Sequence, residues 1–372
     1  MYSDGVPPGP AYPPPGGWPA PPPSYGYGHP PGYGAYPGYP PPQYGRPQEL
    51  KPGIIALRPL NLSDIFNGAF AYIRANPKAT LGLTTIVVVI AQLFALILQI
   101  TPLASSGQLN SAYTGEDAPA VALIGSSLGT VAGAAATWLS GIVLSGLLTV
   151  IVGRAVFGAG ITISAAWQRL RGRIWALLGF TVLEGLGAVL LIAVVVGATL
   201  TAVLIGDAPA GFLVGIPLTL GTIVLMVYLN TMLGFVPPLI VLERLPVIAA
   251  IRRSFTLIRN DFWRVFGIRL LATMVAGMIA GAVAVPFSIG GQILLFASET
   301  TTAVVAGLAL VAVGGAIGQI LTAPFTAGVV VLQYTDRRMR AEAFDLVLRT
   351  GAGAGPVGAT DFADNLWLTS HP

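Results

Sequence analysis

The chain has no cysteine, only two histidines and few charged residues, and each scarcity excludes a class of chemistry. Without cysteine there is no thiolate catalysis, iron–sulfur cluster or disulfide. His29 and His371 lie near the chain ends, outside any predicted core, which excludes a histidine base or histidine metal site in the folded region. The sequence also contains no phosphate loop, metal-ligand cluster or Ser-His-Asp set. We therefore expect neither an enzyme nor a bound cofactor.

The scarcity of charge also decides the class of protein. Charged residues make up 9% of the 372 residues, whereas soluble domains contain about 25%. Hydrophobic residues reach 54% and the mean hydropathy is +0.76. Too few polar groups remain to coat a soluble globule, so the composition predicts a membrane-embedded chain.

The first 52 residues differ in composition from the rest, because they hold 18 of the 31 prolines and 8 of the 12 tyrosines. Such a segment favours polyproline II and cannot bury a core, which predicts a disordered cytoplasmic tail over residues 1–53. Three Pro-Pro-x-Tyr motifs fit grooves that bind polyproline II, although this composition alone would also produce them. They predict protein partners for the tail, and they are Pro22–Tyr25, Pro30–Tyr33 and Pro41–Tyr44.

Long uncharged stretches follow from Ala79 onward. About 20 apolar residues in a helix cross a hydrocarbon layer of roughly 30 Å. On this basis six spans are predicted, near residues 81–101, 132–153, 175–199, 212–236, 266–287 and 303–324. The second, fourth and sixth stretches exceed one crossing, so tilt, a kink at Pro217, Pro286 or Pro324, an external loop or a re-entrant piece all stay open.

The distribution of basic residues predicts the orientation. All 19 Lys and Arg residues fall before residue 79, within 154–173, within 244–269, or after residue 336. The loops between these groups carry acidic residues instead, namely Glu116, Asp117, Asp207 and Glu299. Because cytoplasmic loops are enriched in Lys and Arg, both termini are predicted in the cytoplasm, with the chain in the cytoplasmic (plasma) membrane. The net charge of +4 is thus a topology signal, and no nucleic-acid partner is expected.

An internal repeat is the most informative feature. Three segments align without gaps on an aromatic residue, an arginine four residues later, then a large apolar residue and a glycine. The aromatic and arginine pairs are Phe70 with Arg74, Trp167 with Arg171, and Phe255 with Arg259. Four positions per copy also allow chance similarity among apolar helices. The alignment predicts three units of about residues 61–155, 160–240 and 245–335, each with a short helix followed by two spans.

The short helix of each unit is predicted to be amphipathic and to lie at the membrane surface. Ser63 and Ser164 are the predicted N-caps of the first two helices. Arginines at headgroup level attract anionic lipid by about 1 kcal/mol per charge. Either the helices bind anionic lipid headgroups, or their arginines only fix the topology.

Several motifs resemble the membrane domain named for glycerophosphoryl diester phosphodiesterases. They are the segments Leu57–Leu60, Asp64–Phe70, Pro237–Glu243, Ile251–Phe255, Asp261–Gly267, Pro324–Ala327 and Tyr334–Arg338. The resemblance covers roughly residues 57–350 and is greatest to proline-rich-tailed actinobacterial members. In that family the phosphodiesterase activity belongs to a separate soluble barrel with histidines and a metal, which this sequence does not contain. The resemblance therefore implies a membrane protein and no phosphodiesterase activity.

Glu184 is the ionisable residue that the sequence places deepest in a span. It lies about ten residues past Ile174, or about 15 Å along a helix. A charge there costs a few kcal/mol and usually faces a partner or a polar path. We expect an interhelical ion pair with Arg269; a protonated Glu184 bonded to the backbone is the alternative. Other polar residues in spans are Gln92, Gln99, Asn230, Gln319 and Gln333.

Glycines four residues apart predict close helix packing, at Gly125, Gly129 and Gly133, at Gly277 and Gly281, and at Gly314 and Gly318. They permit a homo-oligomer without requiring one. The predicted fold is an all-α integral membrane protein with six transmembrane helices over residues 54–335, followed by a cytoplasmic short helix and tail over 336–372. The expected function is a non-enzymatic scaffold or accessory protein for envelope or lipid processes; the alternative is a transporter or lipid-handling protein with a polar path near Glu184.

Overall fold

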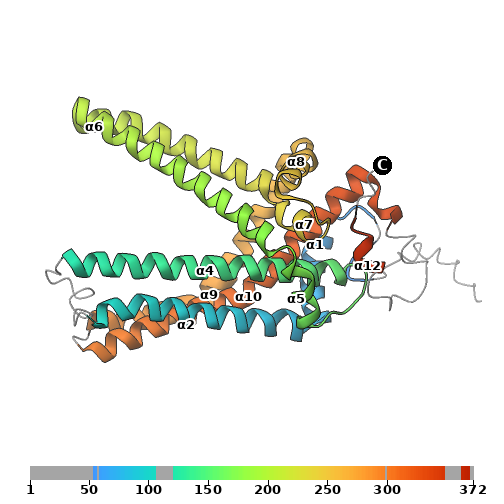
Figure 1. Ribbon diagram of the computed structural model, residues 1–372, viewed down its shortest axis with the longest axis horizontal. Helices are drawn as coiled ribbons and strands as arrows, with labels where there is room; N and C mark the ends of the chain where they lie inside the picture. Colours follow the sequence, from blue (N-terminus) through green and yellow to red (C-terminus); the bar gives the residue numbers. More distant parts are fainter. Residues whose placement is uncertain (1–52, 57, 106–119, 298–299, 348–361, 369–372) are drawn as a thin grey trace, which may run out of the picture. The chain divides into compact units, whose positions relative to one another are not determined.

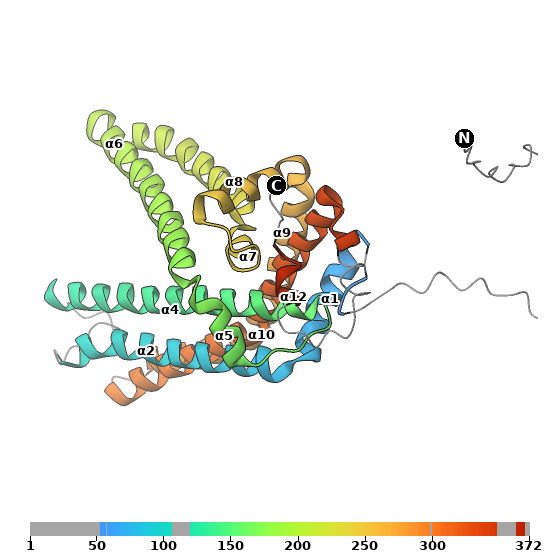
Figure 2. The same ribbon diagram turned by 45° about the vertical axis from the view of Figure 1, so that its right-hand side comes forward.

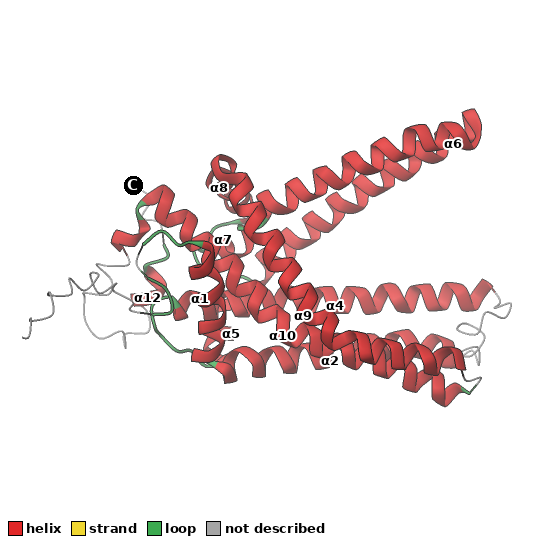
Figure 3. Ribbon diagram, turned by 180° about the vertical axis from the view of Figure 1, so that it is seen from behind, coloured by secondary structure: helices red, strands yellow, loops and turns green. Residues whose placement is uncertain are grey.

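The computed structural model describes residues 53–56, 58–105, 120–297, 300–347 and 362–368. The chain divides into two units, Met1–Gln48 and Glu49–Pro372, and all the described residues belong to the second. Their secondary structure is entirely helical (Figure 3), which confirms the predicted all-α class. The tail with its Pro-Pro-x-Tyr motifs, and the loop residues Glu116, Asp117 and Glu299, lie outside the described residues.

Five helices in the described part are long and apolar enough to cross a membrane. Apolar residues on every side of these helices leave no polar face for water. All six predicted spans overlap with them. The helices are α2 (Leu83–Ser105), α4 (Ala120–Ala155), α6 (Ile174–Leu233), α9 (Phe262–Ala297) and α10 (Thr301–Glu342).

The 60-residue α6 is not one straight helix. Its backbone leaves helical geometry at Gly206 and at Asp207, where φ is 61°, and the two halves then run side by side (Figure 1). Gly215 of the second half lies against Thr199 of the first. The reversal lies between the third predicted span and the fourth. It also shows that the chain turns at Gly206 and Asp207, and not at the predicted kink site Pro217.

The other long helices pack as neighbouring pairs, α2 with α4 and α9 with α10. Small residues allow the close approach: a Cβ at Gly133 would meet the backbone of Ala95, and one at Gly318 would meet that of Ala280. By contrast, a Cβ at Gly277 or Gly281 would meet no neighbour within 4 Å. The glycine spacing thus predicts packing correctly on α4 and α10, but not on α9.

Short helices gather at one end of the long helices, opposite the reversal of α6 (Figure 1). We call this the basal end. It comprises α1 (Leu62–Ala75), α5 (Ile163–Arg171), α7 (Val236–Val241), α8 (Val247–Ile258), α12 (Phe362–Asn365), the π-helical turn η1 (Lys78–Gly82) and the 3-10 turn η2 (Arg259–Asp261). The described Lys and Arg residues lie in these segments, in the adjoining turns and loops, or in the parts of α4, α9 and α10 nearest to them, so they collect toward one end of the long helices.

The predicted caps of α1 and α5 were wrong. Asn61 caps α1 by accepting from the Asp64 N–H, while the Asp64 carboxylate accepts from the Asn61 N–H. Thr162 caps α5 by accepting from the Ala165 N–H. Each true cap lies two residues before the predicted serine, because several capping residue types are adjacent in the sequence and only the backbone selects one.

The best-buried side chains lie near the basal end, where α1 packs against α10. Tyr72 of α1 is fully buried, and its hydroxyl donates to the Pro324 carbonyl of α10. Burial raises the pKa of Tyr72, so the phenol stays neutral and remains a donor. Phe70 and Phe66 pack on Phe325 at the same contact. These contacts fix the angle between α1 and the long helices.

The distal parts of the long helices expose apolar side chains. Leu204 is 86% exposed and Leu213 is 77% exposed, both in α6. Figure 2 shows α6 diverging from α4 away from the basal end. So much exposed apolar surface is untenable in water but is the expected state in lipid.

The basal part of α10 extends past Asp336, and the separate short helical segment that follows covers residues 344–347, later in the chain than predicted. The long helix continues through Asp336 and ends at Glu342, where Ala343 adopts a left-handed conformation with φ of 51°. The reason is that Asp336, Arg337 and Arg338 all have partners at the basal end, so the polar turns remain packed.

Candidate functional site

Two adjoining cavities lie among the long helices, where α6 meets α4, α9 and α10. The larger has a volume of about 880 Å³ and is lined mainly by apolar side chains such as Leu183, Leu190 and Val227. The smaller, of about 340 Å³, is lined by more polar residues of α4 and α10, including Ser145 and Gln319. Both lie within the size range of small-molecule sites.

Seven residues line both cavities and therefore mark their boundary: Phe180, Glu184, Asn230, Leu233, Arg269, Thr326 and Val330. Four of these are polar, and they come from α6, α9 and α10. The site thus has an apolar compartment that ends in a small polar cluster. We call the two cavities together the intramembrane site, because the helices that line them are among those long and apolar enough to cross a membrane.

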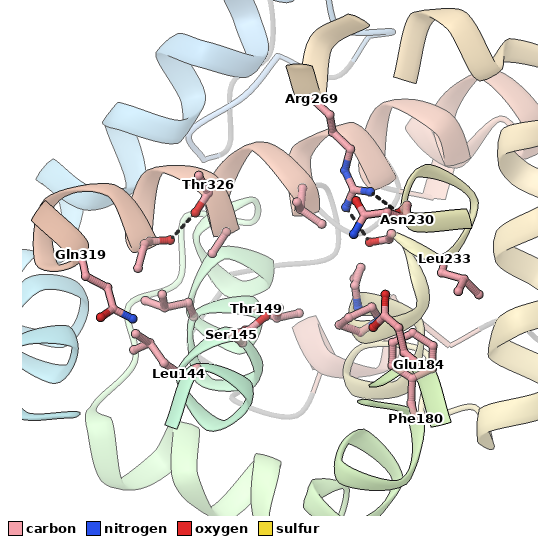
Figure 4. Close-up of a pocket in the computed structure, with 18 residues that line it drawn as sticks. Leu144, Ser145, Thr149, Phe180, Glu184, Asn230, Leu233, Arg269, Gln319 and Thr326 are labelled. Atoms are coloured by element: carbon pink, nitrogen blue, oxygen red, sulfur yellow. Dashed lines mark hydrogen bonds between the residues drawn. The ribbon is translucent and has the colours of Figure 1, made fainter. Parts of the chain in front are cut away.

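Arg269 of α9 is held by the backbone of α6. Its Nη1 donates to the Asn230 carbonyl at 3.0 Å, and its Nη2 donates to the Gly234 carbonyl at 3.1 Å (Figure 4). These carbonyls lie at the carboxyl end of α6, which lacks intrahelical donors and carries a partial negative charge. The guanidinium therefore caps α6 and links it to α9.

Gly234 makes this contact geometrically possible. A Cβ at this position would overlap the Arg269 guanidinium, so any side chain would displace it. Thr231 and Leu233 precede the glycine, and α7 follows it directly. The local sequence therefore ends α6 at a residue that leaves room for a cation from the neighbouring helix.

Glu184 lies on the first half of α6 and faces the same cavities. Among the described residues, however, no ion pair within 4.0 Å joins its side chain to that of Arg269, since both guanidinium contacts go to carbonyl oxygens. The structure brings the two predicted residues to one site, and the choice between an ion pair and a protonated Glu184 stays open.

Three of the five other polar span residues have a place in the site or in the packing between helices. Asn230 and Gln319 line the intramembrane site. Gln333 of α10 instead donates to the Val265 carbonyl of α9, which joins two packed helices. Such single hydrogen bonds between helices are ordinary in membrane proteins.

The six repeat residues lie on short helical segments at the basal end, which are α1, α5, and α8 with η2. Arg74, Arg171 and Arg259 are all exposed. Of the aromatic residues, Phe70 stacks on Phe325, Trp167 is 45% exposed and Phe255 is half-buried. None of the six lines the intramembrane site, and the internal repeat itself stays a prediction.

A buried ion network locks the basal end, and the sequence analysis did not identify it as a site. Glu243, between α7 and α8, has a fully buried side chain. Its carboxylate pairs with Arg253 at 2.7 Å, lies 3.6 Å from Arg338 and accepts from the Tyr334 hydroxyl. Glu342 pairs with the same two arginines. The network joins α8 to the last turns of α10.

A second buried carboxylate joins the start of α1 to α9 and α10. Asp336 accepts from the Leu60 N–H at 2.8 Å and pairs with Arg340 and Arg264. Both arginines also donate to the Leu60 carbonyl. The available signal was the spacing on α10: Tyr334, Arg338 and Glu342 share one helical face, and Asp336 and Arg340 share another.

In the described part of the chain no group of three or more His, Asp or Glu side chains is placed to hold a metal ion. The expectation that the protein needs no cofactor stays a prediction.

Comparison with curated proteins gave no match, and comparison with solved structures gave none. The resemblance to the membrane domain of glycerophosphoryl diester phosphodiesterases stays a prediction, because neither comparison bears on it. One family does match, over residues 56–337, which extend from the segment before α1 to the basal turns of α10. The chain belongs to this family, which is described as a domain of unknown function (DUF7847).

Proposed function

We propose that this protein is a multi-pass membrane protein that holds the hydrocarbon part of a lipid or lipid-like amphiphile in the intramembrane site. Counting the two halves of α6 separately, the chain would cross the bilayer six times, with the basal end in the cytoplasm. The apolar surface of the long helices and the collection of basic residues at one end support this arrangement.

One observation carries the proposal: an apolar cavity of about 880 Å³ ends at a polar cluster that contains Arg269 and Glu184. Apolar side chains favour an acyl chain, and the polar cluster suits the ester or headgroup region of an amphiphile. A soluble polar substrate would leave most of this lining without partners. The arrangement therefore favours lipid handling over transport of an ion or a sugar.

A pair of glycines in α6 allows a matched test. Gly187 lines the larger cavity, whereas Gly197 does not, and a Cβ at either position would meet no neighbour within 4 Å. Gly187→Leu should fill part of the cavity without a clash. Gly197→Leu adds the same side chain to the same helix outside the site.

The experiment uses the full chain in liposomes that contain a phospholipid with a photoreactive group in one acyl chain. Crosslinks to Ala272 and Val329, which line the cavity and are buried, report the cavity, and those around the exposed Leu204 report bulk lipid. We expect Gly187→Leu to lower the ratio of cavity to bulk labelling at least about fivefold. The leucine would occupy space that a bound acyl chain needs, and overpacking of this kind costs ~1 kcal/mol or more. Gly197→Leu should leave the ratio unchanged. Equal ratios in all three proteins would refute the proposal.

The role of a scaffold that recruits partners through its tail stays a prediction. It depends on residues 1–53, and the Pro-Pro-x-Tyr motifs there lie outside the described residues. The intramembrane site neither requires nor excludes it.

A further inference from the structure

A third cavity, of about 460 Å³, lies at the basal end, among the end of α4, the helix α5, the start of α6 and the short α12. It shares no lining residue with the intramembrane site. Its charged lining consists of four arginines and one carboxylate, namely Arg154, Arg169, Arg173, Arg244 and Asp364. We call it the basal cavity.

Two of the arginines already have an acidic partner. The Asp364 carboxylate of α12 lies 3.2 Å from Arg154 and 2.5 Å from Arg169. Trp367 holds this segment in place, since it is buried against Phe157, Phe344 and Tyr334. The C-terminal segment thus places one carboxylate in a site made of cations.

Arg173 and Arg244 are the other two arginines of the lining. Among the described residues, no carboxylate lies within 4.0 Å of Arg173 or Arg244. Arg173 is the N-cap of α6, so it lies beside the unpaired N–H groups of the first turn. Arg244 has a φ of 57°, a left-handed conformation that is uncommon for a non-glycine residue and that turns the chain at the cavity. The lining keeps a net positive charge with Asp364 in place.

We propose that the basal cavity binds a phosphate group, and that Asp364 occupies part of the same site as an internal competitor. Arginine forks match the geometry of phosphate oxygens, and the N-terminus of a helix adds a favourable field. The volume exceeds that of one phosphate, so the group would be carried by a larger molecule. Either a lipid headgroup or a soluble phosphate supplies this chemistry.

The test uses the full chain in nanodiscs. In the first arm the nanodiscs contain only phosphatidylcholine, and inorganic phosphate is titrated by calorimetry. In the second arm phosphatidic acid is added to the bilayer, and its effect on the thermal unfolding midpoint is measured. The variants are Arg173→Gln, Arg244→Gln and Asp364→Asn. Arg171→Gln is the matched control, because Arg171 is exposed, lies two residues from Arg173 and does not line the cavity.

We expect Arg173→Gln and Arg244→Gln each to weaken phosphate binding about tenfold, because each removes one charged hydrogen-bonding partner. Arg171→Gln should bind as the wild type does, although it loses the same charge. Asp364→Asn should bind at least about fivefold more tightly, because the competing carboxylate is gone. This gain keeps the test decisive even if an arginine variant folds poorly.

The two arms also identify the source of the phosphate. A midpoint that rises with phosphatidic acid, without binding of inorganic phosphate, identifies a lipid headgroup. Binding in the first arm identifies a soluble phosphate compound. The proposal is wrong if neither the wild type nor Asp364→Asn responds in either arm, or if Arg171→Gln loses as much affinity as Arg173→Gln.

Discussion

The basal end and the α6 hairpin bury different kinds of side chain, and each departs from the pattern of a soluble protein. At the basal end, charged residues are buried: the side chain of Glu243 is fully buried, and that of Arg338 is 5% exposed. In α6, apolar residues are exposed, and the most apolar part of its span contains no buried residue. The two regions are adjacent in one chain, so composition alone does not explain the contrast.

The difference teaches that the two regions suit different solvents, lipid for α6 and water or headgroups for the basal end, as the proposed membrane location requires. In lipid, apolar side chains gain nothing by clustering, so α6 needs few contacts along its length. At the basal end, paired charges and hydrogen-bonded carbonyls connect helices that the lipid does not hold together. Arg269 combines features of both regions. It is a charged residue that links α6 to α9, and it lies beside an apolar cavity.

The largest expected effect is at Glu243. Glu243→Ala should lower the free energy of unfolding by about 3–5 kcal/mol, because Arg338 and Arg253 would lose their buried counter-charge. The matched control is Asp261→Asn, since Asp261 also pairs with an arginine of α10, Arg337, but is 45% exposed. That variant should lose no more than about 1 kcal/mol. Reversible unfolding in detergent measures the free energy of unfolding of both variants. An equal loss of this free energy in the two variants would contradict the contrast between buried and exposed charge.

A smaller effect is expected at Arg269. Arg269→Gln should cost about 1–3 kcal/mol, because two carbonyls at the end of α6 lose a charged donor. Glu184→Gln should cost less than about 0.5 kcal/mol, because the arginine bonds to carbonyls and not to this carboxylate. The same unfolding measurement applies. If Glu184→Gln is as costly as Arg269→Gln, the two residues act as an ion pair.

The last prediction concerns topology and involves no change in stability. The chain has no cysteine, so each introduced cysteine is a unique label. Ala208 follows the reversal of α6, and Thr256 lies on α8 at the basal end; both are exposed. In intact cells, a membrane-impermeant maleimide should label Ala208→Cys. It should label Thr256→Cys only after permeabilisation. The opposite result would place the basal end outside.

The sequence predicted the long apolar segments and the collection of basic residues at one end, because both depend on hydropathy and charge along the chain. It also led to Glu184 and Arg269, since an ionisable residue within an apolar run is conspicuous. It did not find the carbonyl partners of Arg269. The backbone oxygens that lack a donor are those at the end of α6. No pattern in the sequence around Gly234 marks this residue as the end of the helix.

The networks formed by distant residues could not be predicted from the sequence for a similar reason. Glu243 and Arg338 are 95 positions apart, and Asp364 lies 210 positions from Arg154. In the sequence, charged residues near the ends of spans indicate only topology, so those that form buried pairs cannot be distinguished from those that are exposed. The position of Asp364 in a cavity of arginines depends on how Trp367 packs, which no local pattern specifies.

By itself, the sequence determined the helical class and the apolar surface, because lipid selects helices from composition and periodicity alone. Only the tertiary structure decided which charges are buried and which cavities exist. Both depend on helices brought together from distant parts of the chain, and a low dielectric makes each such pairing matter.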